Sequence, residues 1–218
     1  MARKKLLRLQ EIDVLSNTFR MEQENVEKKL SDFFQNDNPV TLEIGCGHGD
    51  YSINLAEKFP DKNFIALDMK ATRIWVGAKK ALTENISNVA FLIGKAQNLS
   101  DVFTKMKPKE IWVPFPDSLP RRRDDFKRLY STNFIDIYKK ITAVDGVIHF
   151  KTDDLPLYEF AIKNLQRTDV KIIKNSDNLY DLSETSFEEE IKTAYEKVHL
   201  QNGRTIKYIK FQFIIDSD

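Results

Sequence analysis

Residues 40–49 read Val40-Thr41-Leu42-Glu43-Ile44-Gly45-Cys46-Gly47-His48-Gly49, an apolar run followed by three glycines at alternate positions. Such a run predicts a buried strand, and the glycines allow a tight turn and close backbone approach to a ligand before a helix begins. The next apolar run ends at Asp68, where a nucleotide-binding α/β unit places a carboxylate for ribose hydroxyls. An ordinary glycine-rich turn is the alternative, and Asp68 favours a cofactor.

Short apolar runs alternate with segments of helical periodicity along the rest of the chain. Strands are expected at 40–44, 63–68, 89–93, 110–114, 147–151, 170–174 and 205–214. Helices are expected between them, at 50–59, 71–85, 98–106, 125–141, 155–165 and 187–200. This alternation predicts an α/β fold, with a largely parallel seven-stranded sheet and helices on both faces.

The length of 218 residues suits one sizeable core. We expect residues 1–36 to form a basic N-terminal arm and a leading helix, and residues 37–218 to form a single domain. No apolar stretch is long enough to cross a bilayer, and the N-terminus does not resemble a signal peptide. The single cysteine excludes an intramolecular disulfide. Together these features favour a cytoplasmic protein that does not enter membranes.

Polar residues follow five consecutive predicted strands, and ligands of an open parallel sheet bind beyond its carboxyl ends. After the third strand come Lys95 and Ala96, after the fourth Asp117, and after the fifth Asp153. Asp117 closely precedes the run Arg121-Arg122-Arg123. A carboxylate beside a basic cluster suits a nucleobase joined to phosphates, because the arginines neutralise the backbone. A structural network of salt bridges from these arginines to Asp124 and Asp125 is the competing interpretation.

Four motifs together resemble the bacterial tRNA (guanine-N7-)-methyltransferases. The glycine loop, with Glu43 before it, looks like the first motif of Rossmann-like methyltransferases, in which the loop faces S-adenosylmethionine. Residues 115–129 align without a gap with a family stretch Phe-x-Asp-Pro-Trp-Pro-Lys-x-Arg-His-x-Lys-Arg-Arg-Leu. Lys151-Thr152-Asp153 is similar to a Lys-Thr-Asp motif. Thr193-Ala194-Tyr195-Glu196, followed by Gly203 and a last strand, looks like a Thr-x-Tyr-Glu motif.

The resemblance implies a Rossmann-like class I methyltransferase fold with an antiparallel C-terminal strand. It also implies transfer of a methyl group from S-adenosylmethionine to N7 of a guanosine in the variable loop of tRNA, leaving S-adenosylhomocysteine. By matched position, the cofactor would be bound by Glu43, Gly45, Gly47, Asp68, Lys95 and Ala96. The active-site acid would be Asp117. The tRNA would be contacted by Arg121, Arg123, Asp153, Thr193 and Glu196.

The chain departs from the family pattern near this site. Ser118-Leu119 replaces the Pro-Trp pair, which removes an aromatic surface, Asp124 replaces a histidine, and Lys95 replaces an acid or amide. These departures leave open an RNA-binding protein of the same fold with an altered target or lost catalysis. A methyltransferase of small molecules or proteins is a further alternative. The three histidines are too scattered for a recognisable metal site, so no metal is expected.

Overall fold

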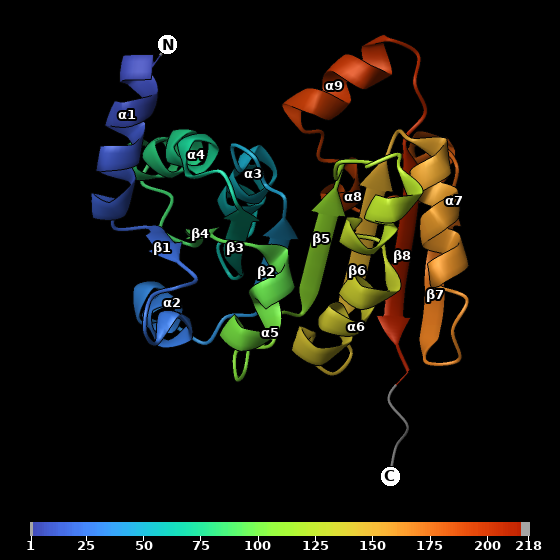
Figure 1. Ribbon diagram of the computed structural model, residues 1–218, viewed down its shortest axis with the longest axis horizontal. Coiled ribbons are helices and arrows are strands. Elements are labelled where there is room, and N and C mark those ends of the chain that lie inside the picture. Colours follow the sequence, from blue (N-terminus) through green and yellow to red (C-terminus); the bar gives the residue numbers. More distant parts are fainter. Residues whose placement is uncertain (1, 215–218) are drawn as a thin grey trace. The chain divides into compact units, whose positions relative to one another are not determined.

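The computed structural model describes residues 2–214, and the chain divides into two compact units, residues 1–108 and 109–218 (Figure 1). Each unit contains four strands and the helices that connect them. The boundary expected between residues 36 and 37 stays a prediction.

The first unit is built on four parallel strands in the order β1, β4, β3, β2. Their bounds are Thr18–Arg20, Val89–Ile93, Asn63–Asp68 and Val40–Ile44. Every residue of β2, β3 and β4 is buried, as expected for parallel strands covered on both faces. Ile44 pairs with Leu67, and Asp68 pairs with Ile93. The carboxyl ends of β2, β3 and β4 therefore meet at one edge.

The leading segment of the first unit is helical and packs on the unit. Helix α1 (Ala2–Glu11) is followed by the 3₁₀ turn η1 (Ile12–Val14), and α1 contacts α4 (Ala71–Thr83). The guanidinium of Arg8 lies 4.9 Å from the ring centre of Trp75, whose indole N–H donates to Glu11 at 3.0 Å. The other helices are α2 (Val26–Phe34), α3 (Asp50–Lys58), η2 (Ala96–Asn98) and α5 (Leu99–Val102).

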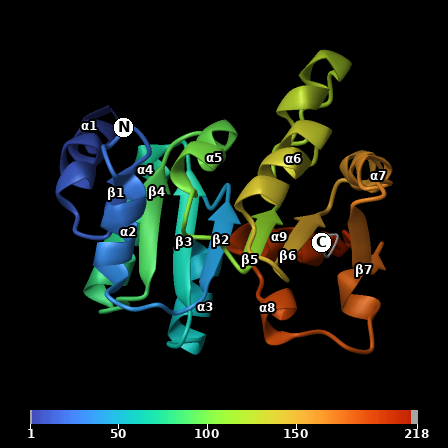
Figure 2. The ribbon, with the colours of Figure 1, turned by 90° about the horizontal axis from the view of Figure 1, so that it is seen from below.

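The second unit contains strands in the order β5, β6, β8, β7. Their bounds are Glu110–Pro114, Val147–Thr152, Lys207–Phe213 and Val170–Ser176. Strand β5 runs parallel to β6, whereas β8 is antiparallel to both β6 and β7. Figure 2 shows α6 (Thr132–Ile141) and α7 (Leu155–Asn164) on one side of these strands and α8 (Phe187–Glu190) on the other. The remaining elements are η3 (Arg122–Lys127), η4 (Leu179–Asp181) and α9 (Ala194–Gln201).

All seven predicted strands are present, and the antiparallel C-terminal strand is confirmed. The described residues contain an eighth strand, β1, which the sequence did not reveal. The helix predicted over 98–106 is shorter, because α5 ends at Val102. The helices predicted over 125–141 and 187–200 are each broken in two, with breaks between η3 and α6 and between α8 and α9. Both breaks hold groups of the candidate site.

Candidate active site

Asp68 links two backbone segments at the carboxyl edge of the first unit. Its side chain, at the end of β3, accepts hydrogen bonds from the N–H of Gly47 at 3.0 Å and from the N–H of Lys70 at 2.7 Å. Its carbonyl accepts from the N–H of Gly94 at 3.1 Å, directly before Lys95. The loops after β2 and β3 thus bind the Asp68 carboxylate, and the segment after β4 binds the Asp68 backbone carbonyl. A carboxylate with one bond to each oxygen retains lone pairs for further donors.

The glycine loop leaves open space where a ligand could approach. Gly45, Gly47 and Gly49 have φ angles of +81°, +59° and +75°, in the left-handed region that glycine adopts without strain. A Cβ added to Gly45 or Gly47 would meet no atom within 4 Å. One added to Gly49 would lie 2.5 Å from a ring carbon of Phe91. Gly45 and Gly47 therefore allow a ligand to approach the backbone closely, and Gly49 allows the loop to pack against the Phe91 ring.

Glu43 lies beneath the loop and is only 3% exposed. One of its oxygens accepts both the backbone N–H of Ser52, at 3.1 Å, and the Ser52 hydroxyl, at 2.5 Å. Burial raises the pKa of Glu43 to about 8, an effect that the Ser52 hydrogen bonds oppose. Glu43 thus holds the first turn of α3 against the loop. Ser52 escaped the sequence analysis, although a hydroxyl in the first turn after a glycine loop is a readable signal.

Lys95 and Ala96 follow β4 at the same edge. The Lys95 side chain is exposed, and half-buried Ala96 begins η2. The same edge holds Gly45 and Gly47, in the loop after β2, and Asp68, the last residue of β3. The structure therefore brings together the residues predicted for the cofactor, with Glu43 supporting them from below.

In the second unit, Asp117 is exposed on the loop after β5. The loop is held at both ends: the N–H of Phe115 donates to the Lys151 carbonyl at 2.8 Å, and the Arg128 guanidinium donates to the Leu119 carbonyl at 3.1 and 3.3 Å. Phe115 and Leu119 have φ angles of +50° and +44°, which side chains other than glycine rarely adopt. Strain of this kind persists only where surrounding contacts enforce it, and it is frequent at functional sites.

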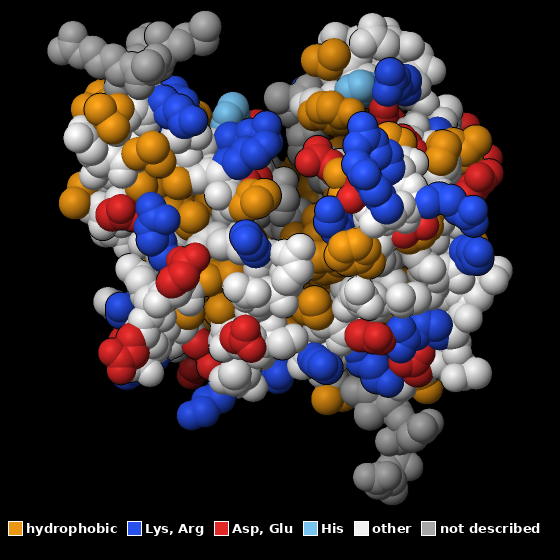
Figure 3. Space-filling view, viewed as in Figure 1, with side chains coloured by type: hydrophobic (Ala, Val, Ile, Leu, Met, Phe, Trp, Pro, Cys, Tyr) orange, Lys and Arg blue, Asp and Glu red, His pale blue; other side chains and the backbone are white. Residues whose placement is uncertain are grey.

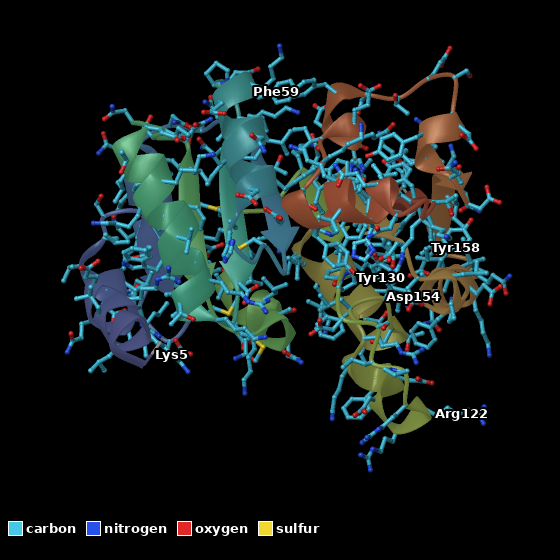
Figure 4. The ribbon with its side chains drawn as sticks, turned by 90° about the horizontal axis from the view of Figure 1, so that it is seen from above. Lys5, Phe59, Arg122, Tyr130, Asp154 and Tyr158 are labelled. Carbon is cyan, nitrogen blue, oxygen red and sulfur yellow. The ribbon has the colours of Figure 1, made fainter. Side chains whose placement is uncertain are left out.

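The arginine run is not part of a salt-bridge network. Asp124 pairs with Lys127 at 2.8 Å and Asp125 with Arg128 at 3.1 Å. Within residues 2–214, the side chains of the run 121–123 make no hydrogen bond or ion pair, and all three residues are exposed. The competing interpretation, in which these arginines pair with Asp124 and Asp125, is therefore wrong. Figure 4 shows Arg122 pointing away from the body of the unit.

Asp153 follows β6 and lies against α9. Its carboxylate is 3.2 Å from Nδ1 of His199 and forms an ion pair with Arg204. Thr193 caps α9, because its hydroxyl accepts the N–H of Glu196 at 3.1 Å. The Lys-Thr-Asp and Thr-x-Tyr-Glu motifs are thus neighbours in the folded unit. His199 and Arg204 were missed by the sequence analysis, since nothing in their spacing marks a pairing with Asp153.

Glu196 is fully buried, which the sequence did not predict. It accepts from Lys151 Nζ at 3.2 Å and from the Tyr180 hydroxyl at 2.6 Å, and the same ammonium donates to the Ile191 carbonyl at 3.1 Å. The two charged side chains are 1% and 0% exposed. Burial lowers the pKa of Lys151, and the negative charge of Glu196 opposes that shift. Glu196 therefore joins β6, η4 and α9 in the folded unit, and is not displayed to solvent.

Among the described residues, no group of three or more His, Cys, Asp or Glu side chains could hold a metal ion. In residues 2–214, no helix has both the length and the apolar character required to span a bilayer.

The sequence of this chain is similar to those of known proteins over most of its length. A family described as "Putative methyltransferase" matches residues 37–209. The tRNA (guanine-N(7)-)-methyltransferase of Cytophaga hutchinsonii is 37% identical, over 98% of this chain and 99% of that protein. The enzyme of the same name from Porphyromonas gingivalis is 41% identical, over 83% of this chain and 74% of that protein.

A solved structure shares the fold. The aminoglycoside resistance methyltransferase NpmB1 superposes with a TM-score of 0.59 at 12% identity, over 88% of this chain and 95% of that one. The α/β Rossmann-like methyltransferase fold predicted from the sequence is thereby confirmed. Because the sequence also matches these enzymes along most of the chain, this protein belongs to the tRNA (guanine-N(7)-)-methyltransferase family.

Proposed function

We propose that this protein transfers a methyl group from S-adenosylmethionine to N7 of a guanosine in the variable loop of tRNA. The observation that carries the proposal is the 37% identity with a tRNA (guanine-N(7)-)-methyltransferase over 98% of this chain. Because tRNA is the proposed substrate, we place the activity in the cytoplasm.

The glycine loop and Asp68 are the proposed cofactor site. Open space beside Gly45 and Gly47 fits a ligand that approaches the backbone closely, and the free lone pairs of Asp68 fit two ribose hydroxyls. When bound, S-adenosylmethionine supplies a methyl group on a sulfonium, which a lone pair attacks directly. Glu43 would act through the loop rather than on the ligand, since Ser52 occupies one of its oxygens. Lys95 and Ala96 would border the adenine end.

Asp117 is the proposed active-site acid. Guanine N7 carries a lone pair and no proton, so the reaction requires no general base, and positioning of the two reactants supplies much of the rate. Methylation makes the guanine ring cationic. An ionised carboxylate near the ring would stabilise this developing charge in the transition state more than in the ground state. Asp117 is therefore assigned an electrostatic and orienting role.

The remaining predicted residues are assigned to tRNA binding in two groups. Arg121 and Arg123 would bind phosphates directly, since both are exposed and unpaired among the described residues. Asp153, after β6, and Thr193, at the start of α9, would contact the tRNA where these two elements lie together. Glu196 would act indirectly, by holding Lys151 and α9 in place.

The test is methylation of unmodified tRNA by the purified protein with labelled S-adenosylmethionine. We expect label in 7-methylguanosine after nuclease digestion, and no label when the target guanosine is replaced by 7-deazaguanosine, which lacks the N7 lone pair. Transfer to any other nucleoside, or none under conditions in which the Cytophaga hutchinsonii enzyme is active, would refute the proposal.

One alternative is a protein of the same fold that binds tRNA and does not catalyse methyl transfer. It is favoured by the departures from the family pattern at Lys95, Ser118, Leu119 and Asp124. In that case the protein would bind tRNA tightly and give no heat with S-adenosylmethionine in calorimetry. Measurable cofactor binding together with label in tRNA would exclude it.

A further inference from the structure

The segment from Arg121 to Phe126 carries an exposed aromatic ring beside unpaired positive charges. Phe126 lies in η3 and is 58% exposed, although burial of a phenylalanine is favourable. Within the described residues, its ring pairs with no other aromatic ring, and the Lys127 ammonium lies 5.4 Å from its centre. A single exposed apolar side chain carries little information. The charges around this one give it meaning.

The acids of η3 are already neutralised within the segment. Asp124 is held by Lys127, and Asp125 by Arg128, which also lies 4.4 Å from the ring centre of Phe160. The side chains of Arg121, Arg122 and Arg123 therefore have no charged partner among the described residues. Figure 3 shows Lys and Arg side chains gathered over this part of the second unit. Three uncompensated guanidiniums beside a bare ring predict an anionic ligand with a flat apolar part.

Single-stranded nucleic acid has this chemistry. Its phosphates pair with arginines, and its bases stack on aromatic side chains whatever their sequence. Aromatic side chains beside basic ones also occur where proteins bind membranes and other proteins, so the choice of RNA rests on the similarity of this chain to tRNA (guanine-N(7)-)-methyltransferases. The loop that carries Asp117 lacks an aromatic residue at its own Ser118-Leu119 pair, so no ring there supplies this contact.

We propose that Phe126 stacks on an unpaired base of the tRNA substrate, while Arg122 binds a neighbouring phosphate. This inference rests on the proposed function for the identity of the RNA. It adds two contacts of different kinds: Arg122 forms an ionic contact with a phosphate, and Phe126 stacks on a base. The related family pattern has a lysine at the position of Phe126, so the stacking contact would be a feature of this chain.

The two contributions separate in the salt dependence of tRNA binding, measured by fluorescence anisotropy with the full chain. We expect Phe126→Ala to weaken binding by about 5- to 100-fold and to leave the slope of log Kd against log salt unchanged. Arg122→Ala should reduce that slope by about one. Phe126→Trp should bind at least as well as the parent, and Phe126→Lys should lose stacking and steepen the slope.

Phe187→Ala is the matched control, because Phe187 is 47% exposed on α8, on the opposite side of the strands of the second unit (Figure 2). It should bind tRNA as the parent does. Equal affinity of Phe126→Ala and the parent would overturn the proposal, as would equal losses in Phe126→Ala and Phe126→Trp. Thermal unfolding of each variant verifies that the fold is retained. A parent protein that binds tRNA without methylating it would refute the proposed function and leave the stacking result standing.

Discussion

Glu43 illustrates how a residue can belong to a site without facing it. Its carboxyl is buried beneath the glycine loop, and burial raises its pKa to about 8. In the unfolded chain the same group titrates near 4.5. Between these two values the native protein holds a proton that the unfolded chain has lost. Stability therefore falls as pH rises from about 4.5 towards 8, and the contribution of the protonated form is lost above that range.

Glu43→Gln should remove this dependence, because the amide resembles the protonated acid. We expect the variant to match the parent at about pH 5 and to exceed its unfolding free energy by an amount on the order of a few kcal/mol at about pH 8. Urea denaturation across this range measures the difference. Glu57→Gln, which removes an exposed carboxylate from α3, the helix that contains Ser52, controls for the loss of one charge. A difference in unfolding free energy between Glu43→Gln and the parent that does not change with pH would contradict a protonated Glu43 in the native protein.

Asp117 is exposed and makes no hydrogen bond or ion pair among the described residues, so its replacement should affect chemistry alone. Asp117→Asn should lower the single-turnover rate of methyl transfer on the order of 10²-fold, as for loss of one preorganised electrostatic contact. Its melting temperature should stay that of the parent. Asp145→Asn, in the turn before β6, is the control, because asparagine accepts the left-handed φ of +63° there. An unchanged rate in Asp117→Asn would remove Asp117 from the site.

At the level of elements, the ion pair between Lys151 and Glu196 joins the end of β6 to α9. Both groups are almost fully buried, so removing one leaves an uncompensated charge. Lys151→Met and Glu196→Leu should each destabilise the protein by about 3–5 kcal/mol, whereas the double variant should cost much less than their sum. Urea denaturation of the four proteins completes the cycle. Additive losses would show that the pair is not coupled.

The breaks in two predicted helices show where sequence patterns stop being informative. Tyr130 lies in the break between η3 and α6. Its hydroxyl is 2.9 and 2.8 Å from carbonyl oxygens of β5 and β6, which share its one hydrogen (Figure 4). The break after α8 frees the Ile191 carbonyl for Lys151. Both breaks are held by contacts distant in sequence, which local periodicity does not contain. The buried strands were predictable because each is a short apolar run, whereas β1 is three half-buried residues long.

The site shows the same division between pattern and contact. Asp68 and the glycines were predictable, because backbone geometry demands particular residues at fixed positions. The burial of Glu196 was not, since its partners Lys151 and Tyr180 come from other elements. Motif matching assigned Glu196 to tRNA contact, whereas its side chain is fully buried against Lys151. The role follows from burial, which a sequence pattern does not record.

At the scale of the whole molecule, the residues assigned to the two ligands divide between the two units. Every proposed cofactor residue lies within residues 1–108, and every proposed tRNA residue within 109–218. Binding of either ligand should therefore be removable without loss of the other. Asp68→Ala should weaken S-adenosylmethionine binding about tenfold or more, as for loss of hydrogen bonds to a charged group, and should leave tRNA affinity unchanged. Arg123→Ala should do the reverse and reduce the salt dependence of tRNA binding.

Calorimetry with the cofactor and anisotropy with tRNA measure the two affinities on the same proteins. Asp68→Asn distinguishes charge from geometry, because the amide keeps one acceptor and loses the carboxylate's second oxygen. We expect its cofactor affinity to lie between those of Asp68→Ala and the parent. Loss of tRNA affinity in Asp68→Ala, with the fold intact, would mean that the ligands are coupled. Linkage would then require bound tRNA and bound S-adenosylmethionine to change each other's affinity by the same factor. Independent losses would establish that each ligand is bound by residues of its own unit.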